Sequence, residues 1–273
     1  MKFKITIDNT TYCSDLSMGK SIAITLLPNG SQPNHFGAPE CTSDTLVAGD
    51  FIGDTKRGGS CNVNQLTIIP HCNGTHTESI SHLINDLVPV YNAIKQSLFP
   101  CALITLEPIS GTQNTEAYRP SVDDSNLVIT REMLQLKLAN YSNQQLHGVV
   151  IRTLPNTKEK QSTCYDENNY PIYLTNDAMS YLVEREICHL LVDFPSVDKM
   201  YDQGMLSNHR LFWNLTSEQK TLNKECRVSR TITEMIYADN QLEDGFYLCN
   251  LQIPEIETDA VPSRPQLFSL EKK

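Results

Sequence analysis

Three histidines, a cysteine and a glutamate fall within residues 71–82, in the sequence HCNGTHTESISH. Imidazole, thiolate and carboxylate groups are the ligands that proteins use for zinc and similar divalent cations. Gly74 lies among them and allows the backbone to turn, so that nearby side chains can converge on one point. A bound divalent cation lowers the pKa of water to about 7 and polarises a carbonyl group, so the segment predicts a metal-dependent hydrolase.

The segment follows one of several short apolar runs that are typical of buried strands. These runs are residues 22–27, 66–69, 102–106, 149–151, 190–192 and 246–251. Thr130 precedes REMLQLKL and Thr175 precedes NDAMSYLVERE, and each threonine hydroxyl can cap the start of a helix. The polar stretches 107–126, 155–171 and 214–230 are expected to be surface loops. Strands that alternate with helices predict an α/β fold, and the length fits one domain over residues 1–273.

Residues 71–82 resemble the HxGTHxDxPxH signature of the metal-dependent kynurenine formamidase family, also called the cyclase family. The run Gly74-Thr75-His76 coincides with the GTH of that signature. Glu78 lies where the family usually has aspartate, and His82 lies at the final histidine. This part of the resemblance is specific, because several chemically distinct residue types match at fixed spacing.

Three further segments resemble later parts of the same family, so the resemblance runs from about residue 16 to residue 265. The sequence DFPSVD at 193–198, followed by His209, resembles a turn that precedes a ligand histidine. Glu234 in ITEMI resembles a glutamate ligand, and DAVPSRP at 259–265 resembles the closing loop. The interval from His209 to Glu234 is longer than the family usually shows, which predicts a loop insertion.

The resemblance implies one or two divalent cations, Zn²⁺ before Mn²⁺. One cation would be bound by His76, Glu78 and a first ligand, and the second by Glu78, His209 and Glu234. The family's first ligand lies four residues before the GTH histidine, which here is Cys72, whereas His71 lies five before. Along an extended segment Cys72 shares a face with His76 and Glu78. We therefore favour Cys72 as the ligand and keep His71 as the alternative.

The remaining histidine of the signature, His82, is predicted to be the proton shuttle. An ordinary histidine titrates near pH 6.5, so it can take a proton from water and deliver it to a departing nitrogen. The resemblance implies an arylformamidase-like amidohydrolase of tryptophan catabolism, with N-formylkynurenine or a related formamide or lactam as substrate. It also implies a swivelling β/β/α domain with a mixed sheet, assembled as a homodimer.

Two other functions fit the same residues. A metal-binding or regulatory protein could retain this scaffold without turnover, because a Cys72 thiolate donates more charge than imidazole and weakens the acidity of the metal. A thiol hydrolase could instead use Cys72 with His76 or His82, and its activity would survive chelation. The metal-dependent hydrolase is favoured over both.

The overall composition disfavours several classes of partner. The formal net charge of −10 disfavours nucleic acid and anionic membranes, because these need a clustered positive surface. The sequence contains no run of eighteen apolar residues and no apolar leader, so a cytoplasmic protein is expected. The nine cysteines include no CxxC pair, and most are expected to be free thiols in the core.

Overall fold

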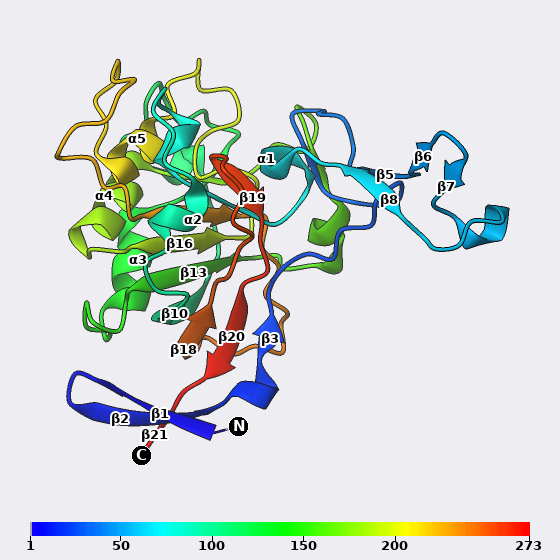
Figure 1. Cartoon of the computed structure of the whole chain (residues 1–273). Coiled ribbons are helices and arrows are strands. Elements are labelled where there is room, and N and C mark those ends of the chain that lie inside the picture. Colours follow the sequence, from blue (N-terminus) through cyan, green and yellow to red (C-terminus); the bar gives the residue numbers. More distant parts are fainter. Residues whose placement is uncertain (1) are drawn as a thin grey trace.

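Four parallel strands form the centre of a nine-stranded sheet in the computed structural model, which describes residues 2–273 (Figure 1). These strands are β10 (Leu98–Leu106), β13 (Gly148–Thr153), β16 (His189–Val192) and β17 (Thr231–Glu234). All four are rich in β-branched and other apolar residues, as expected for strands that are buried on both faces. The C-terminal ends of β16 and β17 therefore lie side by side.

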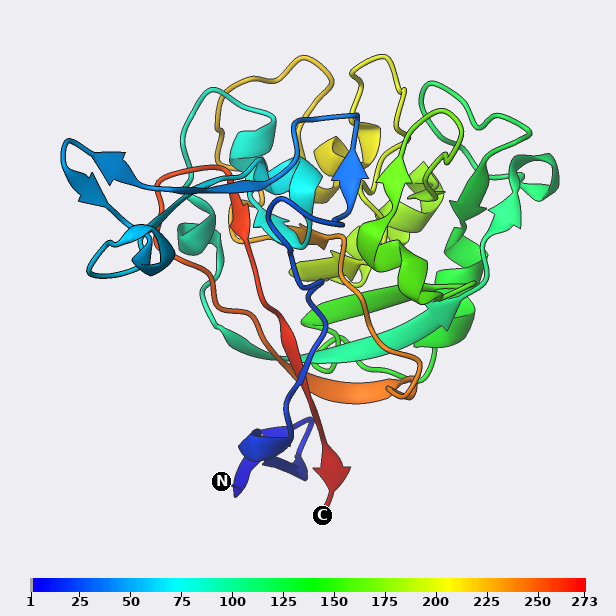
Figure 2. The same ribbon diagram turned by 90° about the vertical axis from the view of Figure 1, so that its right-hand side faces the viewer.

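Antiparallel strands extend the sheet on both sides, in the order β19-β9-β17-β16-β13-β10-β18-β20-β3. The outer strands are β9 (His76–Glu78), β19 (Ala260–Pro262), β18 (Gly245–Asn250), β20 (Gln266–Ser269) and β3 (Lys20–Ser21). The sheet is mixed and curled, which Figure 2 shows from the side. Strand β9 joins the histidine-rich segment to the end of β17.

The two faces of the sheet pack into two separate cores. Along β10, Ala102 and Ile104 point to one face, whereas Cys101 and Leu103 point to the other, as the two-residue period of a strand requires. The first face packs against α3 (Arg131–Leu138), α4 (Asn176–Glu184) and α5 (Ser207–Trp213). The second face encloses a smaller core with residues of β18 and β20.

The two predicted helices begin where the sequence indicates. The hydroxyl of Thr130 accepts a hydrogen bond from the backbone N–H of Met133, and the hydroxyl of Thr175 accepts one from Ala178. These hydrogen bonds satisfy amides that the first turn of a helix leaves unpaired. Both predicted helices and the predicted α/β fold class are confirmed.

The remaining elements lie around this framework. They are β1 (Lys2–Ile7), β2 (Thr10–Asp15), η1 (Leu16–Met18), β4 (Asn34–His35), β5 (Thr42–Thr45), β6 (Val47–Ala48), β7 (Phe51–Ile52), η2 (Thr55–Arg57), β8 (Asn64–Thr67), α1 (Pro70–Asn73), η3 (Ile80–His82), α2 (Val90–Ala93), β11 (Ile109–Ser110), η4 (Gly111–Gln113), β12 (Leu127–Ile129), η5 (Lys158–Ser162), β14 (Cys164–Tyr165), β15 (Tyr173–Leu174) and β21 (Glu271–Lys272). Strands β5 to β8 form an arm that projects from the body (Figure 1). Within residues 2–273 no helix has the length and apolar character needed to cross a bilayer.

Two of the predicted buried strands are wrong, and so is the expectation for most cysteines. Residues 22–27 form only a single bridge, from Ala23 to Ile236, beyond the end of β3. Residues 66–69 overlap β8, which is exposed along its whole length and pairs only with β5. All nine cysteines are free, but only Cys41, Cys101 and Cys249 are buried. An apolar run indicates a strand without showing that a core covers it.

Unfolding should become easier at mildly acidic pH because of His189 in β16. Burial, with His147 nearby, lowers the pKa of His189 to about 3, and its ring stacks on Phe99. In the unfolded chain its pKa is about 6.5, so the folded state excludes a proton that the unfolded state binds below that pH. The contribution to stability is complete above pH 6.5 and is lost as the pH falls toward 3.

Between pH 7.5 and 5.5 this linkage lowers the free energy of unfolding by about 1.4 kcal/mol. Urea unfolding at the two pH values, for the parent chain and for His189→Gln, measures it. The variant should lose about that much of the parent's pH dependence. An identical pH dependence in the two proteins would contradict the assignment.

Candidate metal centre

Strand β9 presents two potential metal ligands on one face of the sheet. His76 and Glu78 are two residues apart in an extended strand, so both side chains point the same way, and both are fully buried. The preceding residue in the turn, Gly74, has a φ of 151°, which residues with a Cβ rarely adopt. The glycine therefore allows the chain to change direction immediately before the strand.

The short helix α1 carries both candidates for the first ligand, His71 and Cys72, and its geometry brings His71 closer to Glu78. Residues 70–73 are helical, with Pro70 at the first position, so the extended geometry assumed for Cys72 does not apply. His71 Nδ1 lies 3.2 Å from Glu78 Oε2. His71, His76 and Glu78 form a group whose ligand atoms all lie within 4.8 Å of one another, and no such group among residues 2–273 contains Cys72. Cys72 is half-buried, and burial together with the charge of Glu234 raises the pKa of its thiol.

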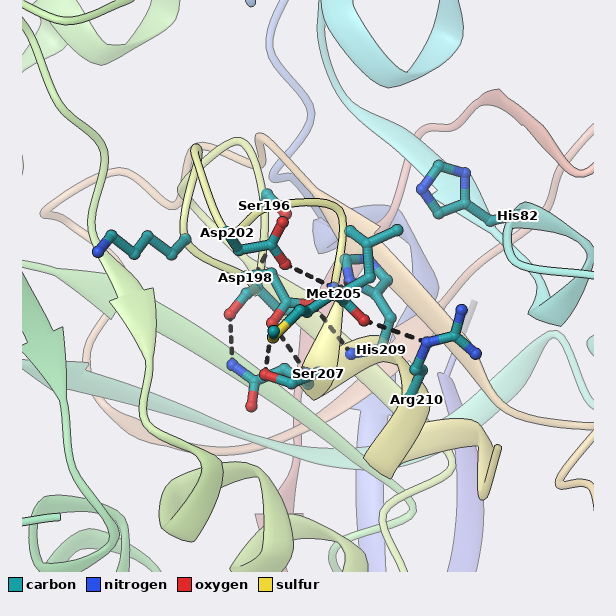
Figure 3. A network of polar contacts seen from close by, with 12 residues as sticks. His82, Ser196, Asp198, Asp202, Met205, Ser207, His209 and Arg210 are labelled. Carbon is teal, nitrogen blue, oxygen red and sulfur yellow. Dashed lines mark hydrogen bonds and ion pairs between the residues drawn. The ribbon is translucent and has the colours of Figure 1, made fainter. Parts of the chain in front are cut away.

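Asp198 positions the third histidine. Its Oδ2 accepts hydrogen bonds from the Nδ1 of His209 at 2.6 Å and from the His209 backbone N–H at 3.1 Å. Its Oδ1 accepts from the backbone N–H of Asn208 and from the hydroxyl of Tyr118, both at 2.8 Å. Figure 3 shows this network at the start of α5, with the ring of His82 turned toward it. The arrangement fixes Nδ1–H of His209 on the aspartate and directs Nε2 to Glu78 Oε1, 3.0 Å away.

Strand register brings Glu234 to the same point. Strand β17 pairs with β9 so that Glu234 lies opposite His76. Glu234 Oε2 lies 3.4 Å from His76 Nε2, and its Oε1 lies 3.7 Å from His209 Nε2. The backbone N–H of Val197 donates to Oε1 at 2.8 Å, which fixes the carboxylate. The histidine-rich segment at 71–82 and the segment that contains Glu234 therefore meet where β9 pairs with the end of β17.

A further carboxylate, Asp259, was not among the predicted site residues. Its Oδ2 lies 2.9 Å from His71 Nε2 and 3.6 Å from His82 Nδ1, and the rings of the two histidines are 4.3 Å apart. Asp259 directly precedes β19, which pairs with β9. The closing loop of the family resemblance begins at this residue, and that was the only signal for it in the sequence. His82, at the end of η3, also lies 3.9 Å from Glu78 Oε2.

Opposite charges dominate the electrostatics of the cluster. Burial acts to raise the pKa of Glu78, but the adjacent His82 and His209 outweigh burial and lower it well below its usual range. Burial acts to lower the pKa of His71, but Asp259 and Glu78 raise it to about 10. The negative charge of the carboxylates thus favours positive charge at this point, whether as protons or as a cation.

The unpaired buried atoms fit a metal ion. His76 Nε2, His209 Nε2 and both oxygens of Glu78 are buried and make no hydrogen bond among residues 2–273. They have close ion-pair contacts only, such as the 3.0 Å from His209 Nε2 to Glu78 Oε1 and the 3.4 Å from His76 Nε2 to Glu234 Oε2. Buried polar atoms are normally satisfied, so a group of orphans that converges requires an explanation. Imidazole nitrogens and carboxylate oxygens are suitable ligands for Zn²⁺ or Mn²⁺. The residues present therefore fit the predicted cation.

The cluster opens into a cavity of about 610 Å³. His71, Cys72, His82, His209 and Glu234 contribute to its wall. The rest of the wall comes from the loop at residues 34–39 and from the segment that links β16 to α5. A small molecule in this cavity would therefore contact the histidine and carboxylate cluster directly.

The fold and the cluster together define a cyclase-type α/β protein with a histidine–carboxylate centre at its strand ends. A family model described as "Putative cyclase" matches residues 9–199, and the chain belongs to this family. It is 24% identical over 237 residues to the kynurenine formamidase of Bacillus mycoides (strain KBAB4), and the alignment covers 86% of this chain and 93% of that protein.

Solved structures show the same fold. An isatin hydrolase bound to the product analogue thioisatinate superposes with a TM-score of 0.61 at 14% identity, covering 93% of each chain. A predicted metal-dependent hydrolase from Bacillus stearothermophilus gives a TM-score of 0.57 at 16% identity, covering 92% of this chain and 97% of the other. These likenesses confirm the predicted cyclase-like fold.

Proposed function

We propose that the protein is a metal-dependent hydrolase of a small amide, similar to an arylformamidase. The observation that carries the proposal is the convergence of orphaned ligand atoms from His76, Glu78 and His209 beside a cavity of about 610 Å³. Membership of the cyclase family supports it, as does the likeness to a kynurenine formamidase. N-formylkynurenine or a related formamide or lactam remains the proposed substrate.

The ligand groups are shared between two positions. His71, His76 and Glu78 form one group, and Glu78, His82 and His209 form another, with Glu234 next to both His76 and His209. Glu78 belongs to both groups, so it is suited to bridge two cations. Zn²⁺ or Mn²⁺ bound there would acidify water and polarise the amide carbonyl.

His82 is placed to move a proton. Its side chain is 27% exposed, whereas that of His209 is only 2% exposed, so His82 is the more accessible to a molecule in the cavity. Asp259, 3.6 Å from its Nδ1, would orient the ring. In this proposal His82 removes a proton from the attacking water and delivers it to the leaving nitrogen.

Formate release tests the function. Formate is measured with formanilide and N-formylkynurenine after addition of Zn²⁺ or Mn²⁺ to metal-free protein. Isatin is assayed in parallel by the opening of its lactam ring, because its hydrolysis releases no formate. Turnover that depends on the added metal supports the proposal. Stoichiometric metal binding without turnover of any of these amides would instead favour a metal-binding or regulatory protein, and activity that survives chelation would favour a thiol hydrolase.

The choice between Cys72 and His71 as metal ligand has a direct test. Cys72→Ala should retain the metal content of the parent chain, whereas His71→Ala should bind metal at least about tenfold more weakly, since it removes one of few ligands. Elemental analysis and titration with a fluorescent zinc chelator measure both. The opposite pattern would restore Cys72 as the ligand.

The assembly and the compartment stay predictions. We propose a homodimer in the cytoplasm, without a nucleic-acid or membrane partner. Light scattering during gel filtration measures the mass in solution. A monomer at micromolar concentration would contradict the homodimer.

A further inference from the structure

His35 is a buried histidine that the metal cluster does not explain. It ends β4, which pairs with β14, and its side chain lines the cavity. The residue is 3% exposed, and neither ring nitrogen has a hydrogen-bond partner among residues 2–273. It belongs to none of the groups of ligand atoms that could bind a metal.

An unpartnered buried imidazole is costly, because burial removes water without a replacement. Leaving a buried polar group unpaired destabilises a protein. Burial, with His76 nearby, lowers the pKa of His35 to about 4, so the ring is neutral at physiological pH. A neutral imidazole offers one N–H donor and one nitrogen acceptor. The natural partner for either atom is a molecule in the cavity that the ring lines.

A strained turn forms the aromatic wall beside this ring. The backbone N–H of Ala38 donates to the carbonyl of His35, and the two residues between them, Phe36 and Gly37, have φ values of 60° and 61°. This conformation is unfavourable for a bulky residue such as Phe36, and strain of this kind is found at functional sites. The Phe36 ring lies 3.9 Å from the His35 ring and 6.2 Å from that of Tyr201, centre to centre. The cavity thus has a flat apolar surface next to one polar contact point.

Away from the histidine–carboxylate cluster, the described residues of the cavity wall offer no free cation for a carboxylate. Lys199 is the one lysine or arginine that lines it in the described part of the chain. The Lys199 ammonium already donates to the carboxylate of Asp123 at 2.6 Å and to the carbonyl of Ser121 at 3.2 Å. The acidic side chain of Asp202 lies in the same wall and would repel an anion. Away from the cluster, an uncharged polar group therefore fits the cavity better than a carboxylate.

We propose that His35 is a substrate-positioning residue, which hydrogen-bonds a second, uncharged polar group on an aromatic amide whose ring packs on Phe36. The inference rests on the proposed hydrolase function and specifies its substrate class. The reacting amide lies at the histidine–carboxylate cluster, and the second group, such as a carbonyl on the neighbouring ring carbon, lies at His35.

Matched substrates separate positioning from folding. The ratio of kcat/KM for 2-formamidoacetophenone to that for formanilide is measured in the parent chain, in His35→Phe and in His35→Gln. The kcat/KM of the parent should be about tenfold higher for the acetyl compound, because one good hydrogen bond that also satisfies a buried group changes a rate or binding constant by about that factor. His35→Phe should bring the ratio to about one, and His35→Gln should restore part of it. The carboxylate analogue 2-formamidobenzoate should be the poorest of the three substrates.

A structural role alone would lower both rates together and leave the ratio unchanged, which would overturn the inference. A parent preference for the carboxylate analogue would overturn the conclusion that the second group is uncharged. If the parent chain hydrolyses none of the formamides, the proposed function fails. In that case His35 is tested independently by calorimetry on the same three proteins. The quantity compared is the ratio of the Kd for 2-aminoacetophenone to the Kd for aniline. Equal Kd ratios in the parent and His35→Phe would reject its role.

Discussion

Glu78→Gln is expected to abolish metal binding and, with it, hydrolysis. Glutamine has nearly the same shape, but it removes the negative charge and one of the two oxygens that face His71, His82 and His209. Among the described residues, Glu78 belongs to two of the three groups of potential ligands and is the one carboxylate in each of those two, so its loss removes the negative charge that both groups would offer a cation. We expect a fall in kcat/KM of at least about 10³-fold, the scale of losing a metal-supported electrostatic interaction.

The matched control is Glu255→Gln, a change of the same kind at an exposed glutamate outside the site. Metal content by elemental analysis and circular dichroism accompany the rates, so that unfolding is distinguished from loss of the cation. The account predicts a folded Glu78→Gln protein without metal and a control that matches the parent. A Glu78→Gln protein that retains both its metal and its activity would show that the centre lies elsewhere.

His82→Gln is expected to give the opposite combination, in which metal is retained and turnover is lost. The 27% exposed side chain of His82 and its 3.9 Å separation from Glu78 place it at the edge of the cluster. Removal of a general acid–base typically lowers kcat by about 10²- to 10⁴-fold. Steady-state kinetics with formanilide, beside elemental analysis, measure both quantities.

Two results for His82→Gln would contradict this prediction, and each has a different meaning. Loss of metal together with activity would show that His82 is a ligand in the group it forms with Glu78 and His209. Unchanged kcat would show that His82 has no part in proton transfer. His147→Gln is the control, because this histidine lies against Phe99 and His189 and away from the cavity.

The sequence was informative wherever local chemistry decides the structure. The caps at Thr130 and Thr175 depend only on a hydroxyl and the amides that follow it, and both helices begin there. The approach of Glu234 to His209 beside Glu78 was implied by the family resemblance of motifs more than 150 residues apart, because each motif has its own specific spacing. Three of the four central strands, β10, β13 and β16, were indicated by their continuous apolar runs, whereas β17 has no such run and was not predicted.

Contacts set by the tertiary structure could not be derived from the sequence. The extended geometry assumed for Cys72 is wrong, because residues 70–73 form a helical turn. Asp259 reaches His71 through the pairing of β19 with β9, and one aspartate at the start of a loop does not reveal that register. The burial of His35 with both nitrogens unpaired depends on elements from several parts of the chain. Periodicity reports the local conformation, and these three features depend on which segments meet.

The most direct test of the metal centre is an anomalous difference map from crystals grown with Zn²⁺, with data collected on both sides of the zinc absorption edge. The account predicts a peak within bonding distance, about 2.0–2.2 Å, of Glu78 and of at least one of His76 and His209. A map with no peak among these side chains, from crystals in which they are ordered and zinc is seen elsewhere, would contradict it.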